Sequence, residues 1–467
     1  MIGCANHGRL EIYLYEPPGA QPLKDVAEIR LMVDTPDNYV TATIPEGETA
    51  FDLSVDVEPD GKSHQIWLEA YTSDKHMISR AIAKPVQFTG KLKTALDLVL
   101  RPVGAFSPTL GSVSTVRKSF ATLVTADFGQ VYILGGVGAD GKLLTITESY
   151  NFYPSSFSAG TDLLEGLTEM VVWPVGQNKF LLFGGITSDQ AMNTNAYVVT
   201  VSKDGIETAL LAEKGPPVAS PELVAVNDTE LLIVGGRDNE GNPLKSLYDV
   251  HVENFQWKKL PVELRYGRVN HASIYLEKGG KVLIVGGVED AAEDVPAEVY
   301  DVADQSLSEV TIDDVAVRGI LKAPYLRAAA LSDGTCVTIG GKISESVFGS
   351  AVHILPECFQ GGCAAFSLLT DLPSTALRFG HTTTVLSPDQ ILIAGGFCAA
   401  ESLCADNLLL NYVEGKFVAE SAGSFQTPRA YHTAMVLPDN TVFFLGGVMQ
   451  NGNLSSDGEI YMPLKYP

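Results

Sequence analysis

A pair of adjacent glycines recurs along most of this chain, each time at the end of a short apolar run. The runs read VYILGG, FLLFGG, LLIVGG, VLIVGG, CVTIGG, ILIAGG and VFFLGG, and successive pairs lie 49, 51, 51, 54, 55 and 51 residues apart. A regular period of about 50 residues indicates a repeat fold in which each copy is one supersecondary unit. The pairs are Gly135 and Gly136, Gly184 and Gly185, Gly235 and Gly236, Gly286 and Gly287, Gly340 and Gly341, Gly395 and Gly396, and Gly446 and Gly447.

Each copy carries the same order of strand signals. An alternating stretch such as HTTTVL precedes the apolar run, and two further strand-like stretches follow, such as SLYDVHV and FQWKKLP. Four short strands per unit, without a helical period, are typical of one β-propeller blade. We expect the apolar run to be buried on both faces between blades, and the glycines to let it leave a crowded interior.

The number of units predicts a closed ring. Seven units of this length account for residues 108–467, but only one strand-like stretch, GEIYMPL, follows the seventh glycine pair. The last unit therefore lacks its outer strand. We expect residues 105–115 to supply that strand, because this pairs an otherwise exposed edge. The prediction is an all-β chain with a seven-bladed propeller over residues 105–467.

The repeats resemble those of kelch proteins. The tryptophan usual in the fourth strand of a kelch blade is present once, as Trp257. The comparable places in other units are held by Phe157, Leu307 and Phe417. This departure, together with the motif described next, is more similar to bacterial secreted kelch proteins than to cytosolic adaptors, and it implies a kelch-like propeller.

An Arg-x-x-His motif opens three of the units. The segments read RVNH, RFGH and RAYH and end in His271, His381 and His432. Only the arginine and the histidine recur, since the residue before the histidine changes. A repeated pair is best explained by a repeated structural role, and we expect these side chains to hydrogen-bond blade to blade near the central channel.

The first part of the chain has a different pattern. Residues 8–104 contain seven short stretches of apolar alternation, separated by turn signals such as PPGAQP and TPDN. Seven short strands in this length predict an immunoglobulin-like β-sandwich, here without a cysteine pair between its sheets. The unit resembles the small β-domains that raise binding or catalytic modules off bacterial surfaces, which implies the role of a spacer.

The six cysteines indicate an oxidising compartment. Cys358 with Cys363 and Cys398 with Cys404 are close pairs that suit short-loop disulfides. Cys336 lies in an apolar strand and is expected to be an inert buried thiol. The start, MIGC, resembles the end of a bacterial lipoprotein signal, which implies a lipid on Cys4 and a tether over residues 1–7. We expect an extracellular protein, or one on the outer surface of a bacterium, that meets the membrane only through this lipid.

Charge and loop composition limit which classes of partner the chain can have. The formal net charge of −24 repels phosphate backbones and excludes nucleic acid as a partner. The loops after the glycine pairs are expected to gather on one face and to bind a protein or a glycan without catalysis or a cofactor. The candidate residues of this face are Asp238, Glu240, Glu289, Asp290 and Tyr431. Their carboxylates could hold calcium, but no spaced calcium loop is present and solvated turns explain them better.

The alternative function is that of a carbohydrate-active enzyme, either galactose-oxidase-like or glycoside-processing, with its site at the channel mouth. A kelch ring after a sandwich resembles galactose oxidase, and Tyr431 and His432 resemble an adjacent pair in that family's copper site. However, His432 belongs to the repeated motif. In addition, the chain has no cysteine between Cys4 and Cys336 to crosslink a radical tyrosine in an early blade. Neither a Gly-x-Ser-x-Gly elbow nor a glycine-rich phosphate loop is present.

Overall fold

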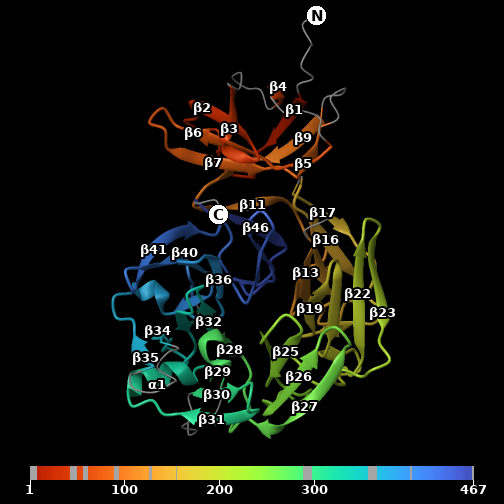
Figure 1. Cartoon of the computed structure of the whole chain (residues 1–467), viewed down its shortest axis with the longest axis vertical. Helices are drawn as coiled ribbons and strands as arrows, with labels where there is room; N and C mark the ends of the chain where they lie inside the picture. Colours follow the sequence, from red (N-terminus) through yellow and green to blue (C-terminus); the bar gives the residue numbers. More distant parts are fainter. Residues whose placement is uncertain are drawn as a thin grey trace, which may run out of the picture.

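The structure is a computed structural model. It describes residues 8–42, 50–55, 61–88, 94–125, 129–153, 155–287, 297–355, 365–399 and 402–464. Over these residues the protein is all-β, apart from one short α-helix and two turns of 3₁₀ helix at Glu277–Gly279 and Ser374–Ala376. Figure 1 shows a small unit at the N-terminal end and a larger group of sheets below it.

The N-terminal unit consists of two main sheets that share one core. The first has the order β4-β1-β9 and the second β10-β7-β6-β2-β3. Alternate residues of their strands, such as Leu10, Leu31 and Leu68, point into the same apolar cluster, as the period of two requires. β1 and β9 pair in parallel, whereas the other strand pairs of these sheets are antiparallel. The strands are β1 (Gly8–Tyr15), β2 (Glu28–Val33), β3 (Thr35–Ala42), β4 (Ala50–Val55), β6 (Ile66–Tyr71), β7 (Met77–Ile82), β9 (Thr94–Val99) and β10 (Arg101–Pro102), with β5 (Ser63–His64) paired to β8 (Val86–Gln87).

The rest of the chain forms seven four-stranded antiparallel sheets, which we number 1 to 7 by the order of their first strands. The first strands are β13 (Ala121–Thr125), β19 (Val171–Gly176), β24 (Glu222–Ala225), β28 (His271–Leu276), β32 (Leu326–Ala330), β36 (Thr382–Ser387) and β43 (Thr433–Val436). The second strands are β14 (Gln130–Leu134), β20 (Lys179–Phe183), β25 (Glu230–Val234), β29 (Lys281–Gly286), β33 (Cys336–Gly340), β37 (Gln390–Ala394) and β44 (Val442–Leu445). The third strands are β16 (Thr147–Asn151), β22 (Ala196–Ser202), β26 (Ser246–His251), β30 (Ala297–Asp301), β34 (Ala351–Ile354), β40 (Asp406–Val413) and β46 (Asp457–Met462). The fourth strands are β17 (Ser156–Ala159), β23 (Gly205–Leu210), β27 (Gln256–Glu263), β31 (Ser306–Val310), β35 (Phe366–Leu368), β41 (Lys416–Ser424) and β11 (Ala105–Ser112).

The seven sheets follow one another around a common centre (Figure 1). Their first strands lie toward this centre, where β24 contacts β28, β28 contacts β32 and β32 contacts β36. The second strands end at the glycine pairs and are buried, as the apolar runs predicted, because apolar clusters fill the space between neighbouring sheets. This arrangement is consistent with the blades of a propeller.

The two ends of the ring meet in sheet 7. Its fourth strand is β11, which pairs antiparallel with β46 and sets Ala105 opposite Met462 and Ser107 opposite Ile460. A strand therefore lies in the region, residues 105–115, from which we expected the outer strand of the last unit. Sheets 1 and 7 are in direct contact, since Tyr150 stacks on Phe443 with ring centroids 4.4 Å apart.

The repeats also contain a helix, contrary to the expectation of no helical period. Helix α1 (Val315–Lys322) connects β31 to β32, and the side chain of Asp314 caps it by accepting from the backbone N–H groups of Ala316 and Val317. Val317, Ile320 and Leu321 are its buried residues, at the spacing of one helical face. With only two turns it gave too short a periodic signal. In the ranges described, no helix is both long and apolar enough to cross a membrane.

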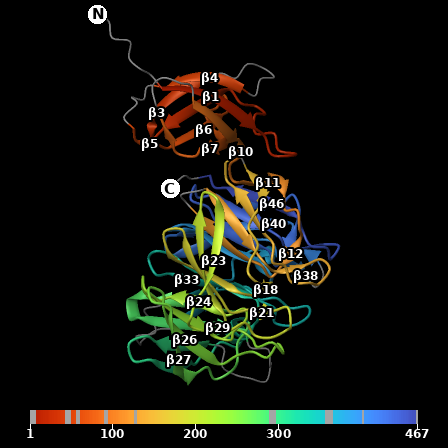
Figure 2. The same ribbon diagram turned by 90° about the vertical axis from the view of Figure 1, so that its right-hand side faces the viewer.

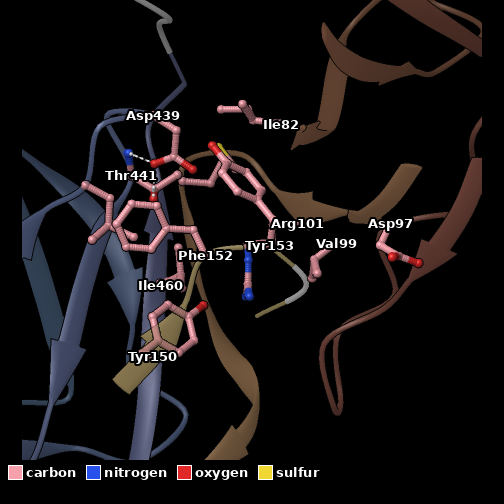
Figure 3. Close-up of a pocket in the computed structure, with 12 residues that line it drawn as sticks. Ile82, Asp97, Val99, Arg101, Tyr150, Phe152, Tyr153, Asp439, Thr441 and Ile460 are labelled. Atoms are coloured by element: carbon pink, nitrogen blue, oxygen red, sulfur yellow. Dashed lines mark hydrogen bonds between the residues drawn. The ribbon is translucent and has the colours of Figure 1, made fainter. Parts of the chain in front are cut away.

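Buried polar contacts join the N-terminal unit to the ring. Arg101 of β10 donates to Ser107 Oγ at 2.7 Å, to the Pro108 carbonyl at 2.8 Å and to Ser155 Oγ at 2.9 Å. Figure 3 shows Arg101, Tyr150 and Asp439 around a small cavity of about 30 Å³ at this junction. Burial lowers the pKa of Arg101 and raises the pKa values of Tyr150 and Asp439. The ring and the N-terminal unit are therefore in close contact there.

Candidate binding site at the mouth ring

The glycine pairs are positions where neighbouring segments approach closely. All fourteen glycines have a positive φ, which glycine adopts without strain. A Cβ on Gly235 would lie 2.6 Å from the carbonyl oxygen of Arg268, in the next sheet. A Cβ on Gly236 would lie 2.6 Å from the carbonyl oxygen of Ala219, where the chain enters the same sheet. The first glycine of each pair thus leaves room for the backbone of the neighbouring sheet. The second leaves room for the segment that enters its own sheet.

The three repeated histidines fill the space that the first glycines leave. His271, His381 and His432 are buried, and their rings face Gly235, Gly340 and Gly395 of the preceding sheet. Phe120 takes the same position in sheet 1, against Gly446. The Nε2 atom of His432 lies 2.9 Å from Thr382 Oγ1 in sheet 6, which is a sheet-to-sheet hydrogen bond of the expected kind. The rings of His271 and His381 have no hydrogen-bond partner among the described residues.

The histidines predict a pH dependence of stability. Burial lowers the pKa values of His271 and His432 from 6.5 to about 3, and nearby arginine charges add to this effect. The unfolded state binds protons between these values and the folded state does not, so the free energy of unfolding falls as the pH drops below about 6.5. His271→Phe should flatten this slope by up to about 1.4 kcal/mol per pH unit in denaturant titrations.

The reverse substitution is the matched control for this prediction. Phe120→His places a histidine at the same position of sheet 1, against Gly446, and should steepen the slope. Equal slopes for the two variants and the wild type would contradict the assignment of the slope to these positions.

The arginines of the motif hold the glycine carbonyls. Arg268 donates to the carbonyl of Gly286 at 2.7 Å, and Arg378 donates to that of Gly395 at 3.0 Å. Arg117 is a fourth copy, since it donates to the carbonyl of Gly135, and it could not be recognised from the Arg-x-x-His motif because a phenylalanine replaces its histidine. Three of these arginines form buried ion pairs with glutamates of the third strands, which are Arg117 with Glu148, Arg268 with Glu298 and Arg429 with Glu459.

A ring of seven left-handed residues lies directly before the first strands or one residue earlier. Their φ values fall between 47° and 67°, although only one of them is glycine. Residues other than glycine seldom adopt this backbone conformation, and those that do cluster at functional sites. We call this set the mouth ring, and its members are Ser119, Glu169, Ser220, Asn270, Tyr325, Gly380 and Tyr431.

Backbone hydrogen bonds connect the mouth ring from sheet to sheet. The N–H of Glu169 donates to the carbonyl of Ser119 at 3.1 Å, and the N–H of Ser220 donates to that of Glu169 at 3.1 Å. Tyr325 donates in the same way to Asn270 at 2.8 Å, and Tyr431 to Gly380 at 2.7 Å. The left-handed backbone therefore has a structural role, and it leaves the side chains free to differ.

The loops after the glycine pairs lie on the same side as the mouth ring. They pair with the segments that lead into the first strands, either as short ladders or as single bridges such as Ala219 with Arg237. Figure 2 shows β12, β18, β21 and β38 gathered toward one side of the ring. The ladders and the loop hairpin are β12 (Arg117–Lys118) with β15 (Val137–Gly138), β18 (Leu167–Thr168) with β21 (Ile186–Thr187), β42 (Arg429–Ala430) with β45 (Val448–Met449), and β38 (Phe397–Ala399) with β39 (Ser402–Leu403).

Sheets 5 to 7 give this face an aromatic side. Tyr325 and Tyr431 meet edge to face with ring centroids 5.6 Å apart, and Tyr431 is 47% exposed. Gly380 makes this contact possible, because a Cβ there would lie 3.0 Å from the Tyr431 ring. Phe397 and Phe379 stack on each other next to Tyr431. Of this group, only Tyr431 was predicted from the sequence.

Sheets 1 to 3 give the same face a polar side. Arg237 donates to both carboxylate oxygens of Glu169, at 2.8 and 2.6 Å, and Ser220 Oγ donates to the same carboxylate at 2.7 Å. A pocket of about 380 Å³ lies beside this cluster and is lined by residues of β13, β19 and β24 and by the three mouth-ring residues of these sheets. The mouth ring therefore combines an exposed tyrosine ring with a hollow that is lined by apolar residues and by a few polar groups, which is the usual composition of a binding site.

The sequence matches no known protein-family model and no curated protein. The assignment of function therefore depends on the geometry of this face.

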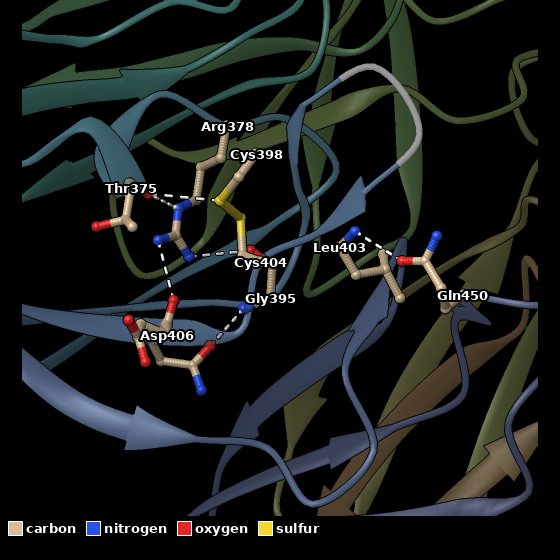
Figure 4. Close-up of a disulfide and its surroundings, with 9 residues drawn as sticks. Thr375, Arg378, Gly395, Cys398, Leu403, Cys404, Asp406 and Gln450 are labelled. Carbon is tan, nitrogen blue, oxygen red and sulfur yellow. Dashed lines mark hydrogen bonds between the residues drawn. A yellow bond between two sulfur atoms is a disulfide. The ribbon is translucent and has the colours of Figure 1, made fainter.

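A disulfide closes the loop that carries Phe397. Cys398 and Cys404 are bonded, as their spacing predicted. Figure 4 shows the bond beside Arg378, which donates to the carbonyls of Thr375 at 2.6 Å and Asp406 at 3.1 Å. The N–H of Leu403 donates to Gln450 Oε1 of the next loop at 2.9 Å. The disulfide and this contact stiffen the aromatic side of the face.

The geometry does not fit a copper site at Tyr431 and His432. The Tyr431 ring lies among Tyr325, Phe379 and Phe397, whereas His432 is buried against Gly395 and approaches Thr382. Partial burial raises the pKa of Tyr431 to about 12, which disfavours the phenolate that a metal binds. Within the described ranges, no group of three or more His, Cys, Asp or Glu side chains is placed to hold a metal ion.

Of the other predicted site residues, Asp238, Glu240 and Cys336 lie within the described ranges and five do not. The side chain of Asp238 accepts the N–H groups of Glu240 and Asn242, each at 2.9 Å, so this loop satisfies its own carboxylate. Cys336 is buried as expected, and burial raises the pKa of its thiol to about 12. The remaining predictions concern residues outside the described ranges, which are Cys4, Cys358, Cys363, Glu289 and Asp290.

Proposed function

We propose that this chain is a non-catalytic binding protein of the bacterial exterior, built as a seven-bladed kelch-like propeller behind an immunoglobulin-like spacer. The observation that carries the proposal is the mouth ring, which presents the exposed Tyr431 and the half-buried Tyr325 on the face that also holds a pocket with Ser119, Glu169 and Ser220 in its lining. Tyrosine rings with few rotatable bonds are efficient contact surfaces for ligands. The ligand is a glycan or a protein that meets this face.

Two further features support this proposal. The seven antiparallel sheets around one centre, with the closing strand β11, have the arrangement expected of propeller blades. The disulfide between Cys398 and Cys404 supports a location outside the reducing cytosol. It also stiffens a loop of the proposed binding face, which reduces the entropy that a ligand would have to overcome.

An array experiment tests the proposed site. The full chain is applied to arrays of glycans and of extracellular proteins, beside Tyr431→Ala and Tyr39→Ala. Tyr39 is the matched control, because it is a tyrosine of the N-terminal unit with a similar exposure of 46%. We expect a ligand whose affinity falls at least about tenfold in Tyr431→Ala and stays unchanged in Tyr39→Ala, since anchoring aromatic residues carry most of the binding energy. A ligand whose affinity is unchanged in Tyr431→Ala would refute the site.

A further inference from the structure

Arg327 stands apart from the other arginines. Among the arginines whose side chains the structure describes, it alone forms neither a hydrogen bond nor an ion pair. It is half-buried, at the second position of β32. By contrast, the arginines of the repeated motif each bond a glycine carbonyl of their own sheet. A cation in a partly desolvated place without a partner is unfavourable, so an anion that reaches it is bound favourably.

Arg327 lies close to the aromatic side of the mouth ring. It follows Tyr325 by two residues, a rise of roughly 7 Å along a strand. Its charge acts on His271, His381 and His432, which come from three different sheets, and it also acts on Tyr431. Arg327 also belongs to a first strand, and β32 contacts β28 and β36, so the residue lies toward the centre of the ring on the strand that follows Tyr325.

The surroundings disfavour an anion with several charges. The His271 and His432 rings are neutral near pH 7, because their pKa values are about 3, so they add no positive charge. Glu222 of sheet 3 interacts with Arg327 over a longer distance without forming an ion pair, and burial raises the pKa of this carboxyl. Glu169 adds a carboxylate at the mouth, and the whole chain carries a net charge of −24. A ligand with several carboxylates, such as an acidic peptide, would be repelled.

We propose that the mouth ring binds an acidic glycan, with the carboxylate of one sugar paired to Arg327 and a sugar ring packed against Tyr431. This inference rests on the proposed binding function and names its ligand class. A guanidinium matches a carboxylate through two parallel hydrogen bonds. The apolar face of a sugar ring suits the exposed ring of Tyr431, while Glu222 and Ser220 offer polar groups for the hydroxyls.

Pairs of acids and esters test the proposal with the full chain. The probes are short oligosaccharides that each contain a single uronic or nonulosonic acid. Each is measured by calorimetry beside its methyl ester, which keeps the sugar and removes the charge. We expect at least one acid to bind and its ester to bind roughly tenfold to a hundredfold more weakly. Arg327→Met should weaken binding of the acid by a similar factor and abolish the preference for acid over ester.

Controls separate this inference from the proposed function. Lys179→Met removes the same charge at the far end of a second strand and should change nothing. Thermal unfolding shows that each variant is folded. Equal binding of acid and ester, or a preference that survives Arg327→Met, overturns the anion site, while a loss of affinity in Tyr431→Ala still supports the mouth ring. Tighter binding of a triglutamate peptide, or no binding of any acid, overturns the acidic-glycan assignment. An affinity for the sugar that is unchanged in Tyr431→Ala overturns both proposals.

Discussion

Gly235→Ala is expected to destabilise the protein by about 3–5 kcal/mol, measured as the free energy of unfolding in denaturant. Two effects add. The position has a φ of 56°, which costs alanine about 1–2 kcal/mol. The new methyl group would also lie 2.6 Å from the carbonyl oxygen of Arg268 and 3.1 Å from Cε1 of His271. Both atoms belong to the next sheet, so relief of the clash requires the two sheets to separate.

Gly280→Ala separates the two effects. Gly280 has nearly the same φ, 60°, but no atom lies within 4 Å of a Cβ there. Its substitution should cost only the backbone part, about 1–2 kcal/mol. If Gly235→Ala were no more damaging than Gly280→Ala, the close approach of neighbouring sheets would not be what the glycine pairs serve.

Arg429→Met is expected to cost a comparable amount, about 3–5 kcal/mol of unfolding free energy. The ion pair of Arg429 with Glu459 at 2.9 Å is almost fully buried. Loss of the arginine leaves a buried carboxylate without its cation, and it also releases the carbonyls of Gly446 and Asp457. Burial already raises the pKa of Glu459, so the variant should lose less stability at acid pH, where this carboxyl is protonated.

The double variant Arg429→Met, Glu459→Gln identifies the contribution of the charge. The amide oxygen can still accept the N–H of Thr427, which Glu459 now accepts at 3.0 Å. The double variant should therefore be more stable than Arg429→Met alone. Lys259→Met removes one partner of an exposed pair and should change stability by less than about 1 kcal/mol. A single and a double variant of equal stability would show that the lost carbonyl contacts, and not the charge, dominate.

The repeat and its strands could be predicted because they depend on local pattern. Apolar runs that end in glycine pairs mark the second strands, and the unpaired last unit located the closing strand β11. The buried glutamates were missed, although Glu298 and Glu459 each follow their arginine by 30 positions. That constant spacing could have predicted the two ion pairs from the sequence.

The mouth ring could not be predicted in this way. Its members share a backbone conformation and no side chain, and only Gly380 and Asn270 are residue types that favour a positive φ. The isolation of Arg327 is equally invisible in the sequence. It depends on which side chains four other sheets place around the guanidinium, and those sheets are brought together only by closure of the ring.

Closure through β11 gives the chain a particular order of assembly. This strand is synthesised before all the other strands of the seven sheets, yet the Thr109 side chain donates to the carbonyl of Gly458, 349 positions later. Contacts of such long sequence separation form late, because the loop entropy must first be overcome. Until β46 has been synthesised, the nascent protein carries an unpaired strand edge, which chaperones or neighbouring chains can bind. A product truncated before residue 457 would keep that edge unpaired.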